Sequence, residues 1–143
     1  MKLHLWRRYR FSASHRLHSA QLGEEENRRV YGKCNNPFGH GHNYVVEAAF
    51  SGPVDEATGM IANPSELDAF VDREVIEPFD HKYLNEEVAE FQENVPTAEN
   101  ICIEIFHRLR HFPRARLERV RVEETGLNSF EYAGESPGET HER

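Results

Sequence analysis

The segment from Leu3 to His15 alternates in polarity with the two-residue period of a β-strand. Side chains two positions apart point to the same face of a strand, so His15 is predicted to face the same way as Phe11 and Ala13. The segment therefore predicts a strand with one face toward a core and an inward-facing histidine at its end. The apolar parity comprises Leu3, Leu5, Tyr9, Phe11 and Ala13, and the polar parity comprises Arg8, Arg10, Ser12 and Ser14.

Three more strands are predicted from the same kind of pattern. They lie at about residues 42–51, 116–125 and 128–133, where apolar and polar residues alternate between turn signals. Residues 16–38 carry charge, glycine and asparagine without periodicity, so they are predicted to form a long functional loop or an irregular hairpin.

Two helices separate these strands into pairs. Asn63 is predicted to cap the first helix, with Pro64 in its first turn, and Pro78 is predicted to end it. Thr97 is predicted to cap the second helix. The order strand-strand-helix-helix-strand-strand predicts an α+β fold, in which an antiparallel sheet carries both helices on one face.

The composition excludes several classes of function. The chain of 143 residues fits one domain, and its net charge of −8 argues against a general nucleic-acid or anionic-membrane binder. Its apolar share of 38% is low for a single core, which leaves room for partner subunits to complete it. We expect a cytoplasmic protein, because the sequence has neither a membrane-spanning run nor an apolar leader, and its two cysteines make no disulfide framework.

The stretch KCNNPFGHGHNY places two histidines at positions 40 and 42, on one face of an extended segment. Two imidazoles on one face favour a divalent metal such as zinc, which accepts their lone pairs. His15 is the candidate third ligand, because it lies at the inward end of a strand. The alternative is that His40 and His42 are ordinary polar residues of a loop.

Five motifs occur in the order and spacing typical of one family: FSASHRLHS, GKCNNPFGHGHNY, EPFDHKYLN, PTAEN and VRVEET. On these motifs the chain resembles the 6-pyruvoyltetrahydropterin synthase family, which includes bacterial relatives that make 6-carboxytetrahydropterin for queuosine. The resemblance runs from about Phe11 to Gly134, nearly the whole chain.

The resemblance implies a T-fold, with a four-stranded antiparallel sheet and two helices on one face. It also implies that three subunits close a twelve-stranded barrel and that two trimers stack as a homo-hexamer, with active sites at subunit interfaces. We expect one T-fold domain over residues 1–134, followed by a polar tail at 135–143.

Site residues follow from the resemblance position by position. It implies that zinc is bound by His15, His40 and His42, and that Cys34 is the catalytic base. It further implies that Asp80 and His81 act on this cysteine from the neighbouring subunit, that Glu124 anchors the pterin, and that Thr97 and Glu99 belong to the pterin-side motif. Ala98 stands where animal enzymes have a second threonine, so this chain lacks one hydroxyl that could contact the substrate.

The residue patterns test some of these roles. Glu124 shares the parity of Val120 and Val122, which predicts that it points inward while Glu123 points to solvent. Asp80 and His81 are adjacent, so they can cooperate only in irregular backbone. Several alternatives stay open: a closed site of Cys34 with three histidines, an ion pair of Glu124 with an arginine, a helix-dipole role for Glu99, and a turn role for Asp80.

The implied reaction is a zinc-dependent lyase step on 7,8-dihydroneopterin triphosphate, giving 6-pyruvoyltetrahydropterin with loss of triphosphate. The spacing from Cys34 to His40 and the Asn-Asn-Pro insert resemble the animal pyruvoyl enzymes. The alternatives are a 6-carboxytetrahydropterin synthase acting on the same substrate and a zinc- and pterin-binding protein without turnover. Seven basic residues could contact the triphosphate, namely Arg8, Arg10, Arg16, Arg28, Arg29, Lys33 and Lys82.

Overall fold

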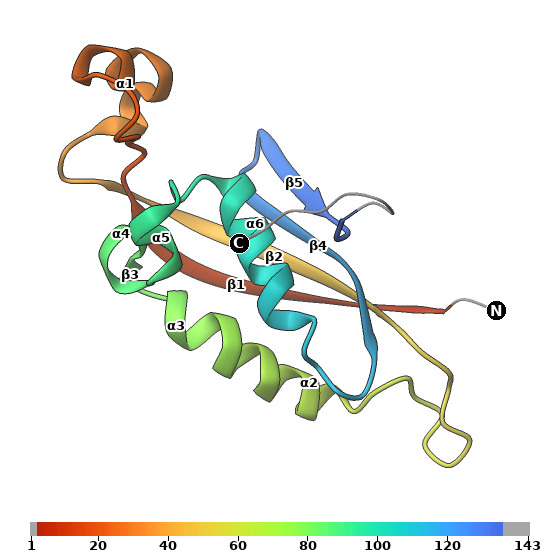
Figure 1. The fold of residues 1–143 in the computed structure, drawn as a ribbon. Helices are drawn as coiled ribbons and strands as arrows, with labels where there is room; N and C mark the ends of the chain where they lie inside the picture. Colours follow the sequence, from red (N-terminus) through yellow and green to blue (C-terminus); the bar gives the residue numbers. More distant parts are fainter. Residues whose placement is uncertain (1–2, 136–143) are drawn as a thin grey trace.

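The computed structural model describes residues 3–135, which form a five-stranded mixed sheet with the two main helices on one face (Figure 1). The strand order is β3-β1-β2-β4-β5, and all neighbours are antiparallel except β3, which runs parallel to β1. The strands are β1 (His4–His15), β2 (His40–Ser51), β3 (Lys82–Tyr83), β4 (Arg116–Thr125) and β5 (Asn128–Tyr132).

The four predicted strands are confirmed, but the prediction of a four-stranded, purely antiparallel sheet is wrong by one strand. The extra strand β3 has two residues, which pair with Ala13 and Ser14 on the outer side of β1. Two residues are too short to carry an alternating pattern, so sequence periodicity cannot reveal such a strand.

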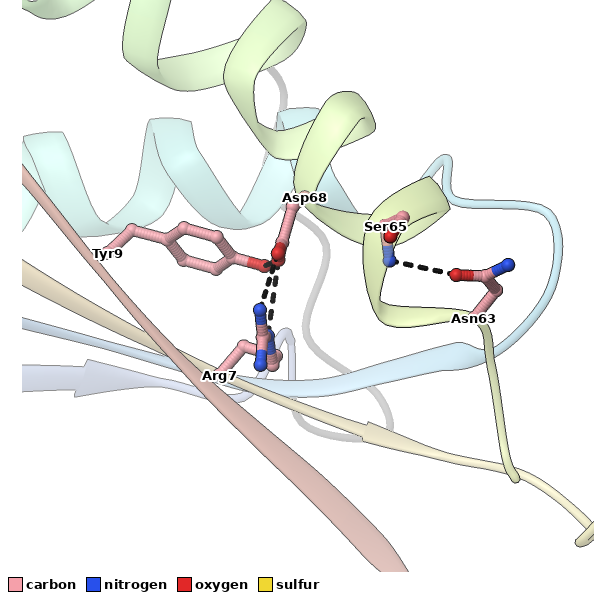
Figure 2. A network of polar contacts seen from close by, with 5 residues as sticks. All are labelled: Arg7, Tyr9, Asn63, Ser65 and Asp68. Carbon is pink, nitrogen blue, oxygen red and sulfur yellow. Dashed lines mark hydrogen bonds and ion pairs between the residues drawn. The ribbon is translucent and has the colours of Figure 1, made fainter. Parts of the chain in front are cut away.

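Two main helices cover one face of the sheet, as predicted. The first consists of α2 (Pro64–Val71), a π-helical turn (Asp72–Ile76) and α3 (Glu77–Phe79), and the second is α6 (Ala98–Leu109). Each predicted cap is confirmed. The side chain of Asn63 accepts from Ser65 N at 2.9 Å (Figure 2), and that of Thr97 accepts from Asn100 N at 3.2 Å. The short helices α4 (Leu84–Glu87) and α5 (Glu90–Glu93) connect the two.

A polar contact joins the first helix to β1. Asp68 of α2 accepts hydrogen bonds from Tyr9 Oη at 2.8 Å and from the guanidinium of Arg7 (Figure 2). Tyr9 and Arg7 both lie on the face of β1 that points toward the helices. The ion pair with Asp68 explains how an arginine is accommodated on that face. The apolar core lies between these layers, and its rings include Phe11 stacked on Tyr44 with centroids 4.9 Å apart.

Residues 16–38 are not only a loop, contrary to the prediction. They contain α1 (Glu24–Tyr31) and a 3₁₀ turn (Gly32–Asn35), which project beyond the end of the sheet (Figure 1). The fully buried side chain of Asn27 holds α1 to the preceding segment, because it donates to three backbone carbonyls and accepts from Ser19 N at 2.7 Å. Because a buried amide holds α1 in place, the helix needs no apolar stripe. The sequence therefore shows no hydrophobic periodicity that would predict it.

None of the helices within residues 3–135 has the length and apolar character that a bilayer crossing requires. The expected polar tail at 135–143 lies, apart from Glu135, outside the described residues.

The prediction that Pro78 ends the first helix is wrong, because the helix continues to Phe79. In a regular helix the carbonyl of Glu74 would accept from residue 78, and proline has no N–H to donate. The π-helical turn lies at this place, and Arg108 of α6 donates from Nη1 to Glu74 O at 3.0 Å. A side chain from another helix therefore supplies the donor that Pro78 lacks.

This account predicts an energetic coupling between Arg108 and Pro78. Arg108→Met should destabilise the protein by a few kcal/mol, since it removes the donor to the part-buried Glu74 carbonyl and the ion pairs with Glu104 and Glu90. In a Pro78→Ala background the new N–H can serve that carbonyl, so the same substitution should cost about 1 kcal/mol less. Urea unfolding of the four proteins measures the coupling, and equal losses in both backgrounds would refute it.

Candidate active site

The register of β1 and β2 brings three histidines to one place on the helix-facing side of the sheet. His15 lies directly opposite His40, and His42 lies opposite Ala13, two residues further along the same face. The ring centroids are 5.0 Å apart for His15 and His40, 4.9 Å for His15 and His42, and 4.7 Å for His40 and His42. The predicted inward orientation of His15 is confirmed, as its side chain is fully buried.

The ring nitrogens of this cluster lie close together, and the sets of ligand atoms within 4.8 Å of one another are His15, Cys34 and His40, and His15, His42 and Glu124. His15 Nε2 and His40 Nε2 face each other at 3.1 Å, and His42 Nε2 is buried with no hydrogen-bond partner among the described residues. A buried polar atom without a partner is costly, and a cation between the rings would remove that cost. The donor set therefore fits a divalent metal that prefers imidazole, as zinc does.

A backbone carbonyl orients the first of these rings. His15 Nδ1 lies 2.8 Å from Pro96 O, so Nδ1 carries the hydrogen and Nε2 presents its lone pair to the cluster. Burial lowers the pKa of His15 to about 4, and burial also lowers the pKa values of His40 and His42. All three rings are thus held in the neutral form that binds a metal.

Cys34 reaches the same cluster from the 3₁₀ turn after α1. Its thiol and one nitrogen each of His15 and His40 lie within 4.8 Å of one another. Burial, followed by the charge of Glu124, raises the pKa of the Cys34 thiol above its usual value. A single chain therefore places the cysteine at the site, and the protein groups around it favour the thiol over the thiolate.

Glu124 approaches the histidines from β4. It is half-buried while Glu123 is exposed, which confirms the predicted strand register. The β4–β5 pairing shifts between Glu123 and Thr125, so Glu124 lies at a β-bulge, a feature that often re-aims a side chain beside a site. Its carboxylate lies within 4.8 Å of ligand atoms of His15 and His42, and burial raises its pKa.

The start of α6 borders this carboxylate. Glu99 is exposed in the first turn of α6, and its charge contributes to the raised pKa of Glu124, after burial, so the two carboxylates are close in space. Thr97 uses its hydroxyl to cap the helix. The segment Pro96–Glu99 therefore supplies the His15 acceptor, the cap and a second carboxylate in succession.

Asp80 and His81 occupy irregular backbone, as predicted. His81 has φ 60°, which makes it the one non-glycine residue with positive φ among residues 3–135. Its Nδ1 lies 3.0 Å from Asp80 Oδ2, while the other oxygen of Asp80 accepts from Ser12 N at 2.9 Å. The bond from Ser12 is the main reason that the pKa of Asp80 is lowered. Backbone strain of this kind is often found at functional sites.

This pair is not part of the histidine cluster of its own chain. Neither Asp80 nor His81 belongs to a group of closely spaced metal-type ligands within the described residues. The His81 side chain is 82% exposed, and it borders a hollow on the edge of β1 with Ser12, Ser14 and Asn43. One chain thus presents Cys34 beside the candidate ligand histidines His15 and His40, and an exposed Asp80–His81 pair outside that cluster.

Two backbone groups that orient side chains of the candidate site could not be identified from residue types. Pro96 acts through its carbonyl and Ser12 through its backbone N–H, and every non-proline residue offers both groups. The bulge at Glu124 is also unmarked, since no glycine or proline stands at that position.

Gly39, which precedes His40, tests how tightly the site is built. Its φ is +75°, and a Cβ atom there would lie 3.1 Å from both His15 O and a ring carbon of Tyr83. Gly59 provides a matched control, because its φ is +73° and a Cβ atom would meet nothing within 4 Å. Gly59→Ala should cost about 1–2 kcal/mol from the left-handed backbone alone, and Gly39→Ala should cost clearly more. Equal losses in urea unfolding would show that the contact at Gly39 is not tight.

Comparison with known proteins gives a consistent result. The family model described as 6-pyruvoyl tetrahydropterin synthase matches residues 4–135. The 6-pyruvoyl tetrahydrobiopterin synthase of Homo sapiens is 45% identical over 130 residues, covering 90% of each chain. A relative from Archaeoglobus fulgidus, provisionally named 6-carboxy-5,6,7,8-tetrahydropterin synthase, is 42% identical over 85 residues, 59% of this chain and 67% of its own.

A solved structure extends the match to three dimensions. The 6-pyruvoyl tetrahydropterin synthase of Caenorhabditis elegans superposes with a TM-score of 0.89 at 38% identity, covering 94% of this chain and 97% of that one. The fold, the motifs and these comparisons agree, and the chain belongs to the 6-pyruvoyl tetrahydropterin synthase family.

Proposed function

We propose that this protein is a 6-pyruvoyl tetrahydropterin synthase, a lyase that converts 7,8-dihydroneopterin triphosphate to 6-pyruvoyltetrahydropterin with loss of triphosphate. The observation that carries the proposal is the cluster of three neutral histidines with a free thiol and a half-buried carboxylate beside it. The similarity to the human enzyme over 90% of both chains supports it.

We infer that His15, His40 and His42 would hold zinc. The orphaned Nε2 of His42 and the facing nitrogens of His15 and His40 fit this role. Three protein ligands leave a fourth position open for substrate, as in catalytic zinc sites. Bound zinc would act as a Lewis acid on the hydroxyl groups of the substrate side chain.

Cys34 is assigned the role of the base that moves protons along the substrate side chain. Its thiol needs a partner that favours the thiolate, because its surroundings within one chain raise its pKa. The pair Asp80–His81 is suited to this task, since the carboxylate orients an imidazole that is exposed at the edge of the sheet. We propose that this pair reaches Cys34 from the neighbouring subunit.

Glu124 is assigned to the pterin ring. A carboxylate can accept two parallel hydrogen bonds from the 2-amino group and N3–H of a pterin, which would orient the ring. The arginine ion pair considered as an alternative is not found for Glu124 among the described residues. Glu99 and Thr97 border the same place, and the helix-dipole role of Glu99 is compatible with a substrate contact.

The shared site requires an oligomer, and we propose the homo-hexamer of two stacked trimers with a closed barrel. The sheet has edges available for closure, because β1 is paired on its outer side only at Ala13 and Ser14 and β5 is the terminal strand. Barrel closure would cover these edges. A single T-fold domain over residues 1–134 and a cytoplasmic location complete the proposal.

A second candidate is 6-carboxytetrahydropterin synthase activity, as in the queuosine pathway. The observation that favours it is the match to the archaeal relative, which covers 59% of this chain. A zinc- and pterin-binding protein without turnover is less well supported, because Cys34, Asp80 and His81 would then have no role.

A product assay tests the proposed function. The zinc-loaded protein is incubated with 7,8-dihydroneopterin triphosphate under reducing, anaerobic conditions, and the pterin products are identified by mass spectrometry. We expect 6-pyruvoyltetrahydropterin and one triphosphate per turnover. Formation of 6-carboxytetrahydropterin as the main product would favour the second candidate, and unchanged substrate would contradict both.

A further inference from the structure

A hollow of about 600 Å³ opens beside His40, between α1, the 3₁₀ turn and the entry to β2. Three cationic side chains line it, from Arg16, Arg28 and Lys33, together with one carboxylate, that of Glu24. This local excess of positive charge occurs in a chain whose net charge is −8. The hollow is therefore a place where an anion would concentrate.

The three cations lack carboxylate partners among the described residues, in contrast to Arg8 and Arg29. Arg8 pairs with Glu47 at 3.5 Å, and Arg29 pairs with Glu26 at 3.3 Å. Arg16, Arg28 and Lys33 form no ion pair within residues 3–135. Their charges are thus not neutralised by a neighbouring side chain.

Part of this hollow is preorganised. The backbone of Arg16 is held on both sides by the Asn85 side chain, which accepts from Arg16 N at 2.8 Å and donates to Arg16 O at 2.7 Å. Arg16 Nε donates to Asn35 O at 3.1 Å, and the buried Asn35 side chain donates to Leu17 O at 2.7 Å. One nitrogen of the guanidinium is occupied, so its terminal amino groups remain for an anion.

Gly32 also lines the hollow, at the start of the 3₁₀ turn. This residue ends α1 with φ 56° and ψ −126°, a conformation open to glycine but strained for other residues. The turn that it starts places Lys33 in the lining of the hollow and the adjacent Cys34 near His15 and His40. The cationic hollow and the thiol are therefore positioned by the same turn.

We propose that this hollow binds the triphosphate group of the substrate through Arg16, Arg28 and Lys33. His40 belongs both to the hollow and to the histidine cluster, so a triphosphate held there would continue directly into a substrate side chain at the cluster. Arginine binds phosphate oxygens in a bidentate manner and lysine contributes a compact charge. The identity of the ligand rests on the proposed function, whereas the affinity for an oligophosphate does not.

Binding of inorganic tripolyphosphate tests the proposal without turnover. Isothermal titration calorimetry is performed on the oligomer, with zinc content measured before and after, because tripolyphosphate chelates metals. Arg28→Gln and Lys33→Gln should each weaken binding by about tenfold or more, as expected for loss of a charge-assisted hydrogen bond. Orthophosphate should bind the wild type more weakly than tripolyphosphate does.

Arg29→Gln is the matched control, since it removes the same charge from the next residue of α1, whose side chain pairs with Glu26. It should change tripolyphosphate affinity by about twofold or less, because only screened long-range attraction is lost. Wild-type affinity in both Arg28→Gln and Lys33→Gln would overturn the proposal. An equal loss in Arg29→Gln would also overturn it, because the effect would then reflect net charge.

A second arm separates this proposal from the proposed function. 7,8-Dihydroneopterin without phosphates should bind Arg28→Gln as tightly as wild type, since the hollow would not contact it. Loss of affinity for this ligand in Arg28→Gln would contradict the assignment of the hollow to the triphosphate. If tripolyphosphate binds as predicted but the triphosphate substrate is not converted, the hollow is an oligophosphate site and the proposed function is wrong.

Discussion

The antiparallel register of β1 and β2 is the constraint on which the site depends. It places His15 opposite His40 and leaves His42 on the same face, so the three rings meet without any loop having to fold over them. A slip of one residue would turn one strand's histidines to the opposite face, because side chains alternate between faces. The register is enforced by the core, since Phe11 and Tyr44 lie on the same face as the histidines and stack on each other. The stability of the fold and the geometry of the proposed metal site are therefore linked through the same pairing.

The remaining functional groups come from interruptions of regular structure. Glu124 lies at a bulge, His81 has a left-handed backbone, Cys34 lies on a 3₁₀ turn, and Pro96 O precedes a helix cap. Each interruption is held by contacts with a regular element. Asp80, for example, is anchored by the backbone of Ser12 in β1, and the helix that leads to it continues past Pro78 because Arg108 supplies a donor. The sheet thus carries the proposed metal ligands, and short irregular segments bring the other candidate groups to its edge.

The parts of the fold with a regular hydrophobic period could be predicted from the sequence. The four long strands, both caps and the inward orientation of His15 and Glu124 follow from alternation and capping chemistry, and all are confirmed. The sequence does not reveal β3, which is too short to alternate, or α1, which is held by the amide of Asn27 instead of an apolar stripe. The predicted end of the first helix at Pro78 is also too early, since the helix continues to Phe79. The group that donates to the Glu74 carbonyl in place of the missing Pro78 N–H belongs to Arg108, 30 residues away from Pro78 in sequence. Long-range polar contacts have no local signature, so they limit what a sequence alone can reveal.

In the proposed site three histidines hold a zinc ion while Cys34 remains free to act as a base. Zinc content of the purified Cys34→Ala oligomer, measured by elemental analysis beside wild type and His40→Ala, tests this most directly. Wild type and Cys34→Ala should each contain one zinc per subunit, and turnover in Cys34→Ala should fall by about 10²–10⁴-fold. His40→Ala should lose zinc, because two ligands make a weak site. Loss of zinc from Cys34→Ala would contradict the account, since Cys34 would then be a fourth ligand in a closed site.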